Sequence, residues 1–206
     1  MSDGRLLVLG TYNRKKGLEL AGLLEGHGLE LRTLADYPEA MEVVECGDSF
    51  AANAALKATR QARHLGHWVL GEDSGLAVDA LAGAPGIFSA RYSGPGATDG
   101  QNNQHLLAEL AGVPPQQRKA HYVCHMTLSD PHGIVRTECE AYCRGRIRLE
   151  PVGTAGFGYD PLFEIVEYHR TMAELGDAVK AAISHRARAM RLLVPQLDAI
   201  VRSGQW

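Results

Sequence analysis

Residues 5–34 read RLLVLGTYNRKKGLELAGLLEGHGLELRTL, and this stretch decides the fold class. The apolar run 5–10 ends in glycine, which is typical of a buried strand. Leu20 and Leu24 recur at a helical spacing, and 29–34 reads as a second strand. A strand, a polar turn, a helix and a strand in this order indicate an α/β fold.

The next part of the chain continues the α/β pattern. Asp48 or Ser49 is expected to cap a helix that ends at Gly66. A third apolar run follows at 67–71 and predicts another strand. The segment 83–100 is rich in glycine and proline, so it reads as an ordered loop or a hairpin.

The rest of the chain is rich in strands and then helical. A short helix is expected over 102–111, and the β-prone segments 119–130 and 133–144 predict a hairpin. Residues 171–174 fit a capping box for a C-terminal helix that Pro195 should kink or split. We therefore expect a mixed β-sheet with flanking helices, and the family resemblance described below implies that this sheet is elongated.

Length and composition exclude several classes of protein. The chain has 206 residues, of which 45% are hydrophobic and 22% charged, as in ordinary globular proteins. We expect one domain, residues 1–206, with two lobes; the resemblance to a known family described below further implies a central substrate groove between the lobes. The net charge of −3 argues against a nucleic-acid partner. Apolar runs are too short for a membrane span and no signal pattern is present, so we expect a cytoplasmic protein.

The cysteines carry little functional signal. Four cysteines are too few for a disulfide scaffold in a chain of this size, and we expect reduced thiols. A zinc site is conceivable from His121, Cys124, His125, Cys139 and Cys143. Their spacings match no zinc-finger pattern, and neighbouring residues of a strand face opposite sides. We do not favour zinc.

Thr11, Asn13 and Lys16 lie where the first strand leads into the first helix. Backbone N–H groups at the start of a helix attract anions, and Lys16 adds a positive charge. The glycines and the Gly-Lys-Ser/Thr ending of a Walker A loop are missing. The segment is therefore either a phosphate-binding turn or a surface turn with solvated lysines.

Glu72 and Asp73 follow a predicted buried strand, at the edge where α/β proteins collect their ligands. Two adjacent carboxylates in such a place need solvent, a cationic partner or a metal ion. Mg²⁺ takes one or two carboxylates together with water and substrate phosphate, and Glu45 could supply one more. The alternative is an acidic turn that caps the next segment.

Two further segments could recognise a nucleotide. Residues 157–160 are Phe-Gly-Tyr-Asp, and aromatic rings stack on nucleobases. The alternative is a buried aromatic corner. Lys180 lies one helical turn before Ser184-His185-Arg186, so several cations could meet a phosphate or a purine oxygen. The alternative is a solvated helix face.

Taken together, these segments resemble the inosine triphosphate pyrophosphatase family, and the resemblance extends from Leu6 to about Leu193. Six motifs carry it in chain order: Thr11-x-Asn13-x-x-Lys16; Ser49-Phe50-x-x-Asn53-Ala54-x-x-Lys57-Ala58; Asp73-Ser74-Gly75-Leu76-x-Val78-Asp79-x-Leu81; Gly83-Ala-Pro-Gly86-x-x-Ser89-Ala-Arg-Tyr-Ser-Gly94; Phe157-Gly-Tyr-Asp-Pro-x-Phe163; and Lys180 followed by Ser184-His-Arg186. Any one of them could arise by chance, whereas all six in this order are very specific.

The resemblance implies Mg²⁺-dependent hydrolysis of ITP, dITP or XTP to the monophosphate and pyrophosphate, by a homodimer. Such an activity keeps these non-standard purine nucleotides out of DNA and RNA. The resemblance further implies that Asp73 is the catalytic proton acceptor and that Glu45 and Asp73 bind the metal. It assigns contacts with the substrate to a set of residues: Thr11, Asn13, Lys16, Ser74, Phe157, Gly158, Tyr159, Asp160, Lys180, His185 and Arg186.

A few positions depart from the family pattern. Glu72 stands where an aspartate is common, and Ala52 stands where a glutamate usually precedes Asn53. Tyr12 and Lys15 replace small glycines of the first turn. Two alternatives therefore stay open. The chain could be a non-catalytic purine-nucleotide-binding protein, or a related pyrophosphatase for modified pyrimidine or methylated nucleoside triphosphates.

Overall fold

The computed structural model describes residues 5–206, in which strands and α-helices alternate from β1 to β4, the four strands β4 to β7 follow one another, and two helices end the chain. The strands are β1 (Arg5–Leu9), β2 (Leu29–Thr33), β3 (Trp68–Val78), β4 (Lys119–Ser129), β5 (Val135–Ile147), β6 (Phe163–Ile165) and β7 (Arg170–Thr171). The α-helices are α1 (Arg14–Leu23), α2 (Phe50–Leu65), α3 (Asp99–Glu109), α4 (Met172–Ile183) and α5 (His185–Arg202). The strands form one sheet in the order β2-β1-β3-β4-β5-β6-β7. Of the helices in residues 5–206, none has the length and apolar character that a membrane span needs.

The chain divides into two compact units. Unit 1 comprises Met1–Asp73, Cys124–Ala141 and Arg186–Trp206, and unit 2 comprises Ser74–Val123 and Tyr142–His185. The three long strands β3, β4 and β5 each contribute residues to both units.

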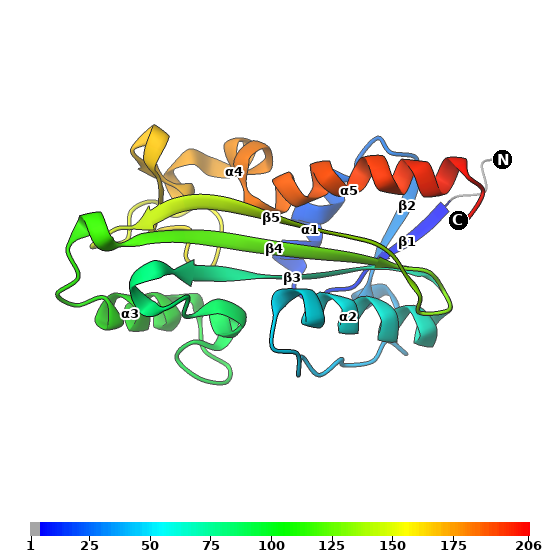
Figure 1. Ribbon diagram of the computed structural model, residues 1–206, viewed down its shortest axis with the longest axis horizontal. Coiled ribbons are helices and arrows are strands. Elements are labelled where there is room, and N and C mark those ends of the chain that lie inside the picture. Colours follow the sequence, from blue (N-terminus) through cyan, green and yellow to red (C-terminus); the bar gives the residue numbers. More distant parts are fainter. Residues whose placement is uncertain (1–4) are drawn as a thin grey trace. The chain divides into compact units, whose positions relative to one another are not determined.

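Unit 1 is built on parallel strands with helices on both faces. β1 is parallel to both β2 and β3, and Leu7 is opposite Leu31 on one side and Trp68 on the other. Side chains of a strand alternate between faces. Leu7 therefore packs with the apolar residues of α1 and α5, whereas Val8 packs with Ala62 of α2. Figure 1 shows α5 and α2 on opposite sides of these strands.

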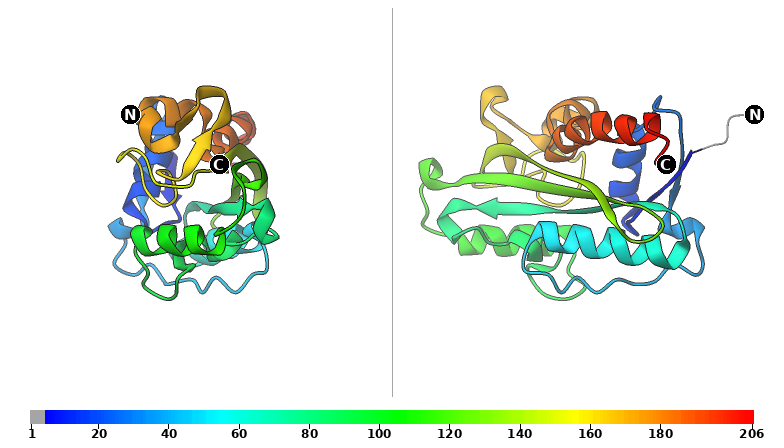
Figure 2. Two further views of the ribbon diagram at one scale, coloured as in Figure 1. Left: turned by 90° about the vertical axis from the view of Figure 1, so that its left-hand side faces the viewer. Right: turned by 45° about the vertical axis from the view of Figure 1, so that its right-hand side comes forward.

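Unit 2 has antiparallel strands and its own core. β6 pairs antiparallel with both β5 and β7, which makes the sheet a mixed one, as predicted. Its core gathers aromatic and aliphatic side chains, chiefly Leu76, Val78, Leu106, Tyr122, Tyr159, Leu162, Phe163 and Met172. In Figures 1 and 2, α3 and α4 lie on opposite sides of the strands of this unit. The predicted mixed α/β fold with flanking helices is thus confirmed.

Helix ends follow the predicted capping residues, with one difference. Ser49 caps α2 by accepting from the N–H of Ala52, and Gly66 ends it at a φ of 68°. The side chain of Asn13 caps α1, which therefore begins at Arg14. Lys16 was expected in a polar turn before the helix, but the Asn13 cap places it inside the first turn of α1.

The prediction that the third strand ends before Glu72 was wrong. β3 runs on to Val78, so Glu72 and Asp73 lie within a strand instead of in a turn after it. Carboxylates can stay in a buried strand only if they are compensated, and both have cationic partners here.

The C-terminal segment was predicted to be one helix that Pro195 kinks or splits, but two helices form and the division lies at Ser184. The backbone is extended at Ser184, with φ −63° and ψ 160°, and this residue separates α4 from α5. Pro195 lies inside α5. Lys180 thus belongs to the end of α4, whereas His185 and Arg186 begin α5.

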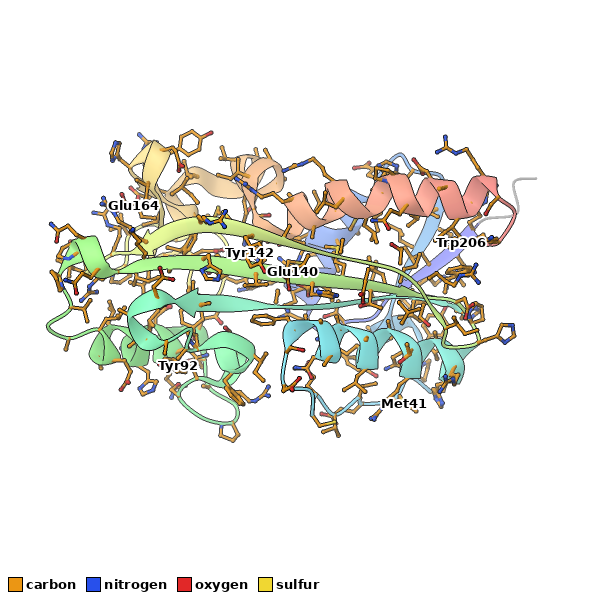
Figure 3. All side chains as sticks on the ribbon, in the orientation of Figure 1. Met41, Tyr92, Glu140, Tyr142, Glu164 and Trp206 are labelled. Atoms are coloured by element: carbon orange, nitrogen blue, oxygen red, sulfur yellow. The ribbon has the colours of Figure 1, made fainter. Side chains whose placement is uncertain are left out.

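The two tryptophans pack against each other in unit 1. The rings of Trp68 and Trp206 stack with centroids 4.5 Å apart and an interplanar angle of 6°. Figure 3 labels Trp206, which lies just beyond the end of α5. The stack joins the end of the chain to the start of β3.

Replacement of Gly71 tests how closely α2 packs on β3. A Cβ at Gly71 would lie 2.3 Å from the carbonyl oxygen of Ala54 and 2.7 Å from the nitrogen of Ala58. We expect Gly71→Ala to lower the free energy of unfolding by about 1–3 kcal/mol, because the helix backbone must move. Urea unfolding measures this. In the control Gly22→Ala nothing lies within 4 Å of the added methyl, so no loss is expected. Equal stability of Gly71→Ala and the wild type would contradict the close packing.

Candidate active site

Glu72 lies at the centre of a buried network of charges in unit 1. The residue is only 1% exposed. Arg186 donates from Nη2 to Oε1 of Glu72 at 2.9 Å, and Nζ of Lys16 lies 3.1 Å from Oε2. Arg186 also donates from Nη1 to Glu19 of α1. Two cations thus compensate two carboxylates, which allows all four charges to stay largely out of water.

The network keeps Arg186 charged. Burial alone lowers the pKa of Arg186, but the carboxylate of Glu72 and then that of Glu19 raise it well above its ordinary value. The Cys124 thiol, which donates to Glu72 at 3.5 Å, has a pKa raised by burial and by that carboxylate. Cys124 is therefore a protonated thiol in this network and no nucleophile.

Asp73 points to the other face of β3, toward α2, because consecutive side chains of a strand alternate. Lys57 donates from Nζ to Oδ1 of Asp73 at 2.8 Å and to Oε1 of Glu45 at 3.1 Å. Asn53 donates to Oδ2 of Asp73 at 3.4 Å and accepts from the N–H of Gly47 at 2.9 Å. Asn53 and Lys57 are one turn apart on α2, so both reach the same carboxylate.

Asp73 combines burial with a neighbouring cation. Burial raises the pKa of Asp73, while Lys57 and Lys16 act in the opposite direction and leave it above its ordinary value. Burial alone lowers the pKa of Lys57, but Asp73, Glu45 and Glu72 raise it above its ordinary value. A carboxylate of raised proton affinity beside a fixed ammonium is suited to accept a proton from water.

The turn before α1 is organised by its own side chains. Asn13 accepts from the N–H groups of Lys15 at 3.0 Å and Lys16 at 3.2 Å, and Thr11 accepts from the N–H of Asn13 at 3.1 Å. These N–H groups are already satisfied. What the turn offers to an anion is therefore its side chains and not its backbone, and the charged one is Lys16, whose ammonium also pairs with Glu72.

The predicted aromatic segment forms a turn in unit 2 around Asp160, which is 2% exposed. Asp160 accepts at Oδ2 from the N–H of Phe157 at 2.9 Å and from Nζ of Lys180 at 2.6 Å. The ammonium of Lys180 also lies 4.1 Å from the centroid of the Phe157 ring, in a cation–π contact. One carboxylate thus holds the ring and the cation together. We call residues 157–160 the aromatic turn.

His185 joins the aromatic turn through Tyr122 of β4. The rings of His185 and Tyr122 stack with centroids 4.7 Å apart and an interplanar angle of 12°. Tyr122 donates from its hydroxyl to Oδ1 of Asp160 at 3.4 Å. Burial and then Asp160 raise the pKa of Tyr122 well above its ordinary value, so the hydroxyl stays a donor.

The structure gathers the predicted site residues into two clusters, one in each unit. In unit 1, Lys16 and Arg186 meet at Glu72, and Glu45 meets Asp73 through Lys57. In unit 2 Lys180 and His185 lie with the aromatic turn, residues 157–160. Thr11 and Asn13 belong to the turn before α1 in unit 1. Ser74, the next residue after Asp73 in β3, is partly buried.

Some partners of these residues were missed at the level of sequence. Asn53 and Lys57 belong to the motif that begins at Ser49 and are four positions apart. On a helix this spacing puts both side chains on one face, from which both could have been expected to reach the same partner. Glu19 follows Lys16 by three positions on α1, and this spacing likewise puts the two side chains on one face of the helix. Tyr122 had no local signal, because its partners in the fold are far away in the chain.

Glu45 and Asp73 are the two residues predicted to bind a metal. Both carboxylates lie within 3.1 Å of Nζ of Lys57, so they face one position. Residues 5–206 contain no group of three or more His, Cys, Asp or Glu arranged for metal binding. A pair of oxygen donors fits Mg²⁺, which usually completes its coordination with water and phosphate.

Comparison with known proteins places the chain in a family. The model of the Ham1 family matches residues 7–196. The chain belongs to the Ham1 family. A dITP/XTP pyrophosphatase of Rhodopirellula baltica is 55% identical, covering 96% of this chain and 95% of that protein. One of an Exiguobacterium species is 46% identical, covering 93% and 96%. A solved HAM1 protein of Coxiella burnetii is 35% identical with a TM-score of 0.86, covering 94% of this chain and 98% of that chain. The resemblance seen in the six motifs is confirmed.

Replacement of Glu72 tests the buried network. We expect Glu72→Gln to lower the free energy of unfolding by about 3 kcal/mol, because Arg186 and Lys16 lose a shared carboxylate in a buried site. Urea unfolding provides the measurement. Glu30→Gln is the control, since Glu30 and Arg32 pair at 2.7 Å with about half of each side chain exposed. If both variants changed stability equally, the network would not be a main support of unit 1.

Proposed function

We propose that this chain hydrolyses dITP and XTP, together with ITP, to the monophosphate and pyrophosphate. Membership of the Ham1 family, whose relatives here are named dITP/XTP pyrophosphatases and match over nearly their full length, supports this. The observation that carries the chemistry is the buried Asp73, held by Lys57 and paired through it with Glu45. In the cell, the activity would keep these nucleotides out of DNA and RNA.

In the proposed reaction, Asp73 accepts a proton from the attacking water. The phosphoanhydride bond between the α- and β-phosphates breaks, and pyrophosphate leaves. Lys16 and Lys57 offset the negative charge of the phosphates as it develops. Thr11 and Asn13 contact the phosphates from the turn before α1. Asn53 keeps the carboxylate of Asp73 oriented by its hydrogen bond at 3.4 Å.

We propose Mg²⁺ as the cofactor, with Glu45 and Asp73 as its protein ligands. When bound, the ion would neutralise phosphate charge and make the attacking water more acidic. The departure at Glu72 does not weaken this proposal. Glu72 belongs to the face of β3 opposite Asp73, where it pairs with Arg186 and Lys16. Its longer side chain therefore affects that network and not the proposed pair of ligands.

We propose that the aromatic turn binds the purine. Phe157 stacks on the base, with Ser74, Tyr159 and Lys180 as further substrate contacts. His185 and backbone N–H groups near Phe157 are the candidate donors to the 6-oxo group of hypoxanthine or xanthine. For Arg186, contact with the substrate stays a prediction from the sequence. Adenine carries an amino group at that position, so a donor would face a donor, and such mismatches discriminate strongly.

A substrate panel with identification of the products tests the reaction. Purified protein with Mg²⁺ is expected to release pyrophosphate from dITP, ITP and XTP, and far less from dATP, GTP, dUTP and TTP. Pyrophosphate and orthophosphate are measured separately. Orthophosphate as the first product would refute the proposed bond cleavage. Binding of ITP without turnover would favour the non-catalytic alternative, and preference for dUTP or TTP would favour the pyrimidine alternative.

Asp73→Asn tests the proton acceptor. We expect kcat for dITP to fall by at least about 10²-fold, because an amide cannot take the proton from water. Circular dichroism should show an unchanged fold. Asp48→Asn, in the exposed loop before α2, is the control and should keep wild-type turnover. Near-normal turnover of Asp73→Asn would exclude this residue as the base.

Removal of metal tests the cofactor. Dialysis against a chelator should abolish turnover, and added Mg²⁺ should restore it. Glu45→Gln should raise the Mg²⁺ concentration for half-maximal activity about tenfold, because one of two carboxylate ligands is lost. Turnover that persists in excess chelator would contradict the proposal. The homodimer and the cytoplasmic location stay predictions from the sequence.

A further inference from the structure

We propose that α3 positions the aromatic turn for base recognition, through Asp99 and Asn103. Neither residue belongs to the predicted site. The proposal rests on the proposed function in one respect, namely that the aromatic turn receives the purine. It adds positioning residues to the site. In this proposal Asp99 and Asn103 touch neither the base nor a phosphate, and they set where the Phe157 ring lies.

The main observation is a clamp on a single residue of the turn. The N–H of Gly158 donates to Oδ2 of Asp99 at 2.9 Å, and the carbonyl of Gly158 accepts from Nδ2 of Asn103 at 3.1 Å. Asp99 and Asn103 are one turn apart, so both reach from the same face of α3. Gly158 has a φ of +63°, which favours glycine and lets the chain turn sharply there. Both backbone polar groups next to Phe157 are thereby fixed by one helix.

A second route joins α3 to the same turn. Asn102, 3% exposed, accepts from the N–H and the hydroxyl of Ser93, both at 2.9 Å, and donates to the carbonyl of Ala90 at 3.2 Å. The residue before Ala90 is Ser89, whose carbonyl accepts from the hydroxyl of Tyr159 at 2.8 Å. The segment that α3 holds through Asn102 thus holds the aromatic turn through Tyr159.

This segment is itself anchored on two sides. The hydroxyl of Ser89 accepts from the N–H of Leu76 in β3 at 2.8 Å. The ring of Tyr92, labelled in Figure 3, packs on His105 of α3 with centroids 4.6 Å apart. The connection from α3 to Tyr159 therefore runs through a segment that is hydrogen-bonded to a strand and packed against a helix.

The clamp completes the support of the Phe157 ring. On one side, Asp160 accepts from the N–H of Phe157, and the ammonium of Lys180 lies over the face of the Phe157 ring. On the other side α3 holds the next residue, Gly158. An aromatic ring that stacks on a planar base binds more tightly when its position is set in advance. Loosening the clamp should weaken contacts with the base and leave contacts with the phosphates unchanged.

One feature of Asn103 points to positioning and not to stability alone. Its Oδ1 is buried and accepts no hydrogen bond from residues 5–206, while its Nδ2 is spent on Gly158. A buried acceptor without a partner reduces stability. The role of this side chain is therefore to place Gly158 through the bond from Nδ2.

The test compares a ligand that has a base with one that lacks it. Binding of inosine monophosphate and of inorganic tripolyphosphate, each with Mg²⁺, is measured by calorimetry on the full chain. In Asp99→Ala and Asn103→Ala we expect Kd for inosine monophosphate to rise about tenfold, the effect of about 1.4 kcal/mol, and Kd for tripolyphosphate to stay unchanged. Gln104→Ala, exposed on the same helix, is the control and should match the wild type.

A conservative variant separates positioning from loss of the fold. Asp99→Asn keeps an acceptor for Gly158, so its Kd for inosine monophosphate should return to within about twofold of the wild type. In turnover of XTP, Asp99→Ala should raise KM and leave kcat unchanged. Equal losses for both ligands, no loss in either alanine variant, or no rescue by Asp99→Asn would overturn the proposal.

The two proposals can fail separately. The alanine variants could bind inosine monophosphate more weakly than the wild type while the wild type releases no pyrophosphate from dITP. That result would refute the proposed function and support the clamp. Wild-type protein that hydrolyses dITP while both alanine variants keep its KM would refute the clamp and leave the proposed function intact.

Discussion

Two consecutive carboxylates in the middle of a buried strand are the constraint on which unit 1 depends. Glu72 is 1% exposed and Asp73 5%, and their side chains point to opposite faces of β3. A buried charge without a partner would cost several kcal/mol. Each face must therefore deliver a cation. α1 and α5 bring Lys16 and Arg186 to one carboxylate, and α2 brings Lys57 to the other.

This arrangement links stability to the proposed chemistry. The same ammonium groups that permit Glu72 and Asp73 to be buried are those that a polyphosphate would attract. Lys57 in particular contacts both Asp73 and Glu45, the proposed base and the proposed second metal ligand. A substitution at either carboxylate therefore changes the electrostatics of its neighbours as well as its own role.

Local features of the fold could be predicted from sequence, and those that depend on distant partners could not. Ser49 and Gly66 bound α2 through capping and a left-handed φ, both of which are properties of single residues. The continuation of β3 through Glu72 depends on Arg186, which lies 114 positions away. The break at Ser184 carries no glycine or proline signal, so the periodic pattern predicted an unbroken helix there.

The same distinction applies to the site. Motifs named the side chains suited to meet phosphate, water or base, because such chemistry needs particular residue types at short spacings. They did not name Tyr122, Asp99 or Asn103, because a supporting residue can be any side chain with a donor or acceptor in the right place. Asp99 and Asn103 act on the backbone of Gly158, which offers no side chain to recognise. Geometry is the only source for such residues, and they decide how firmly the aromatic turn is held.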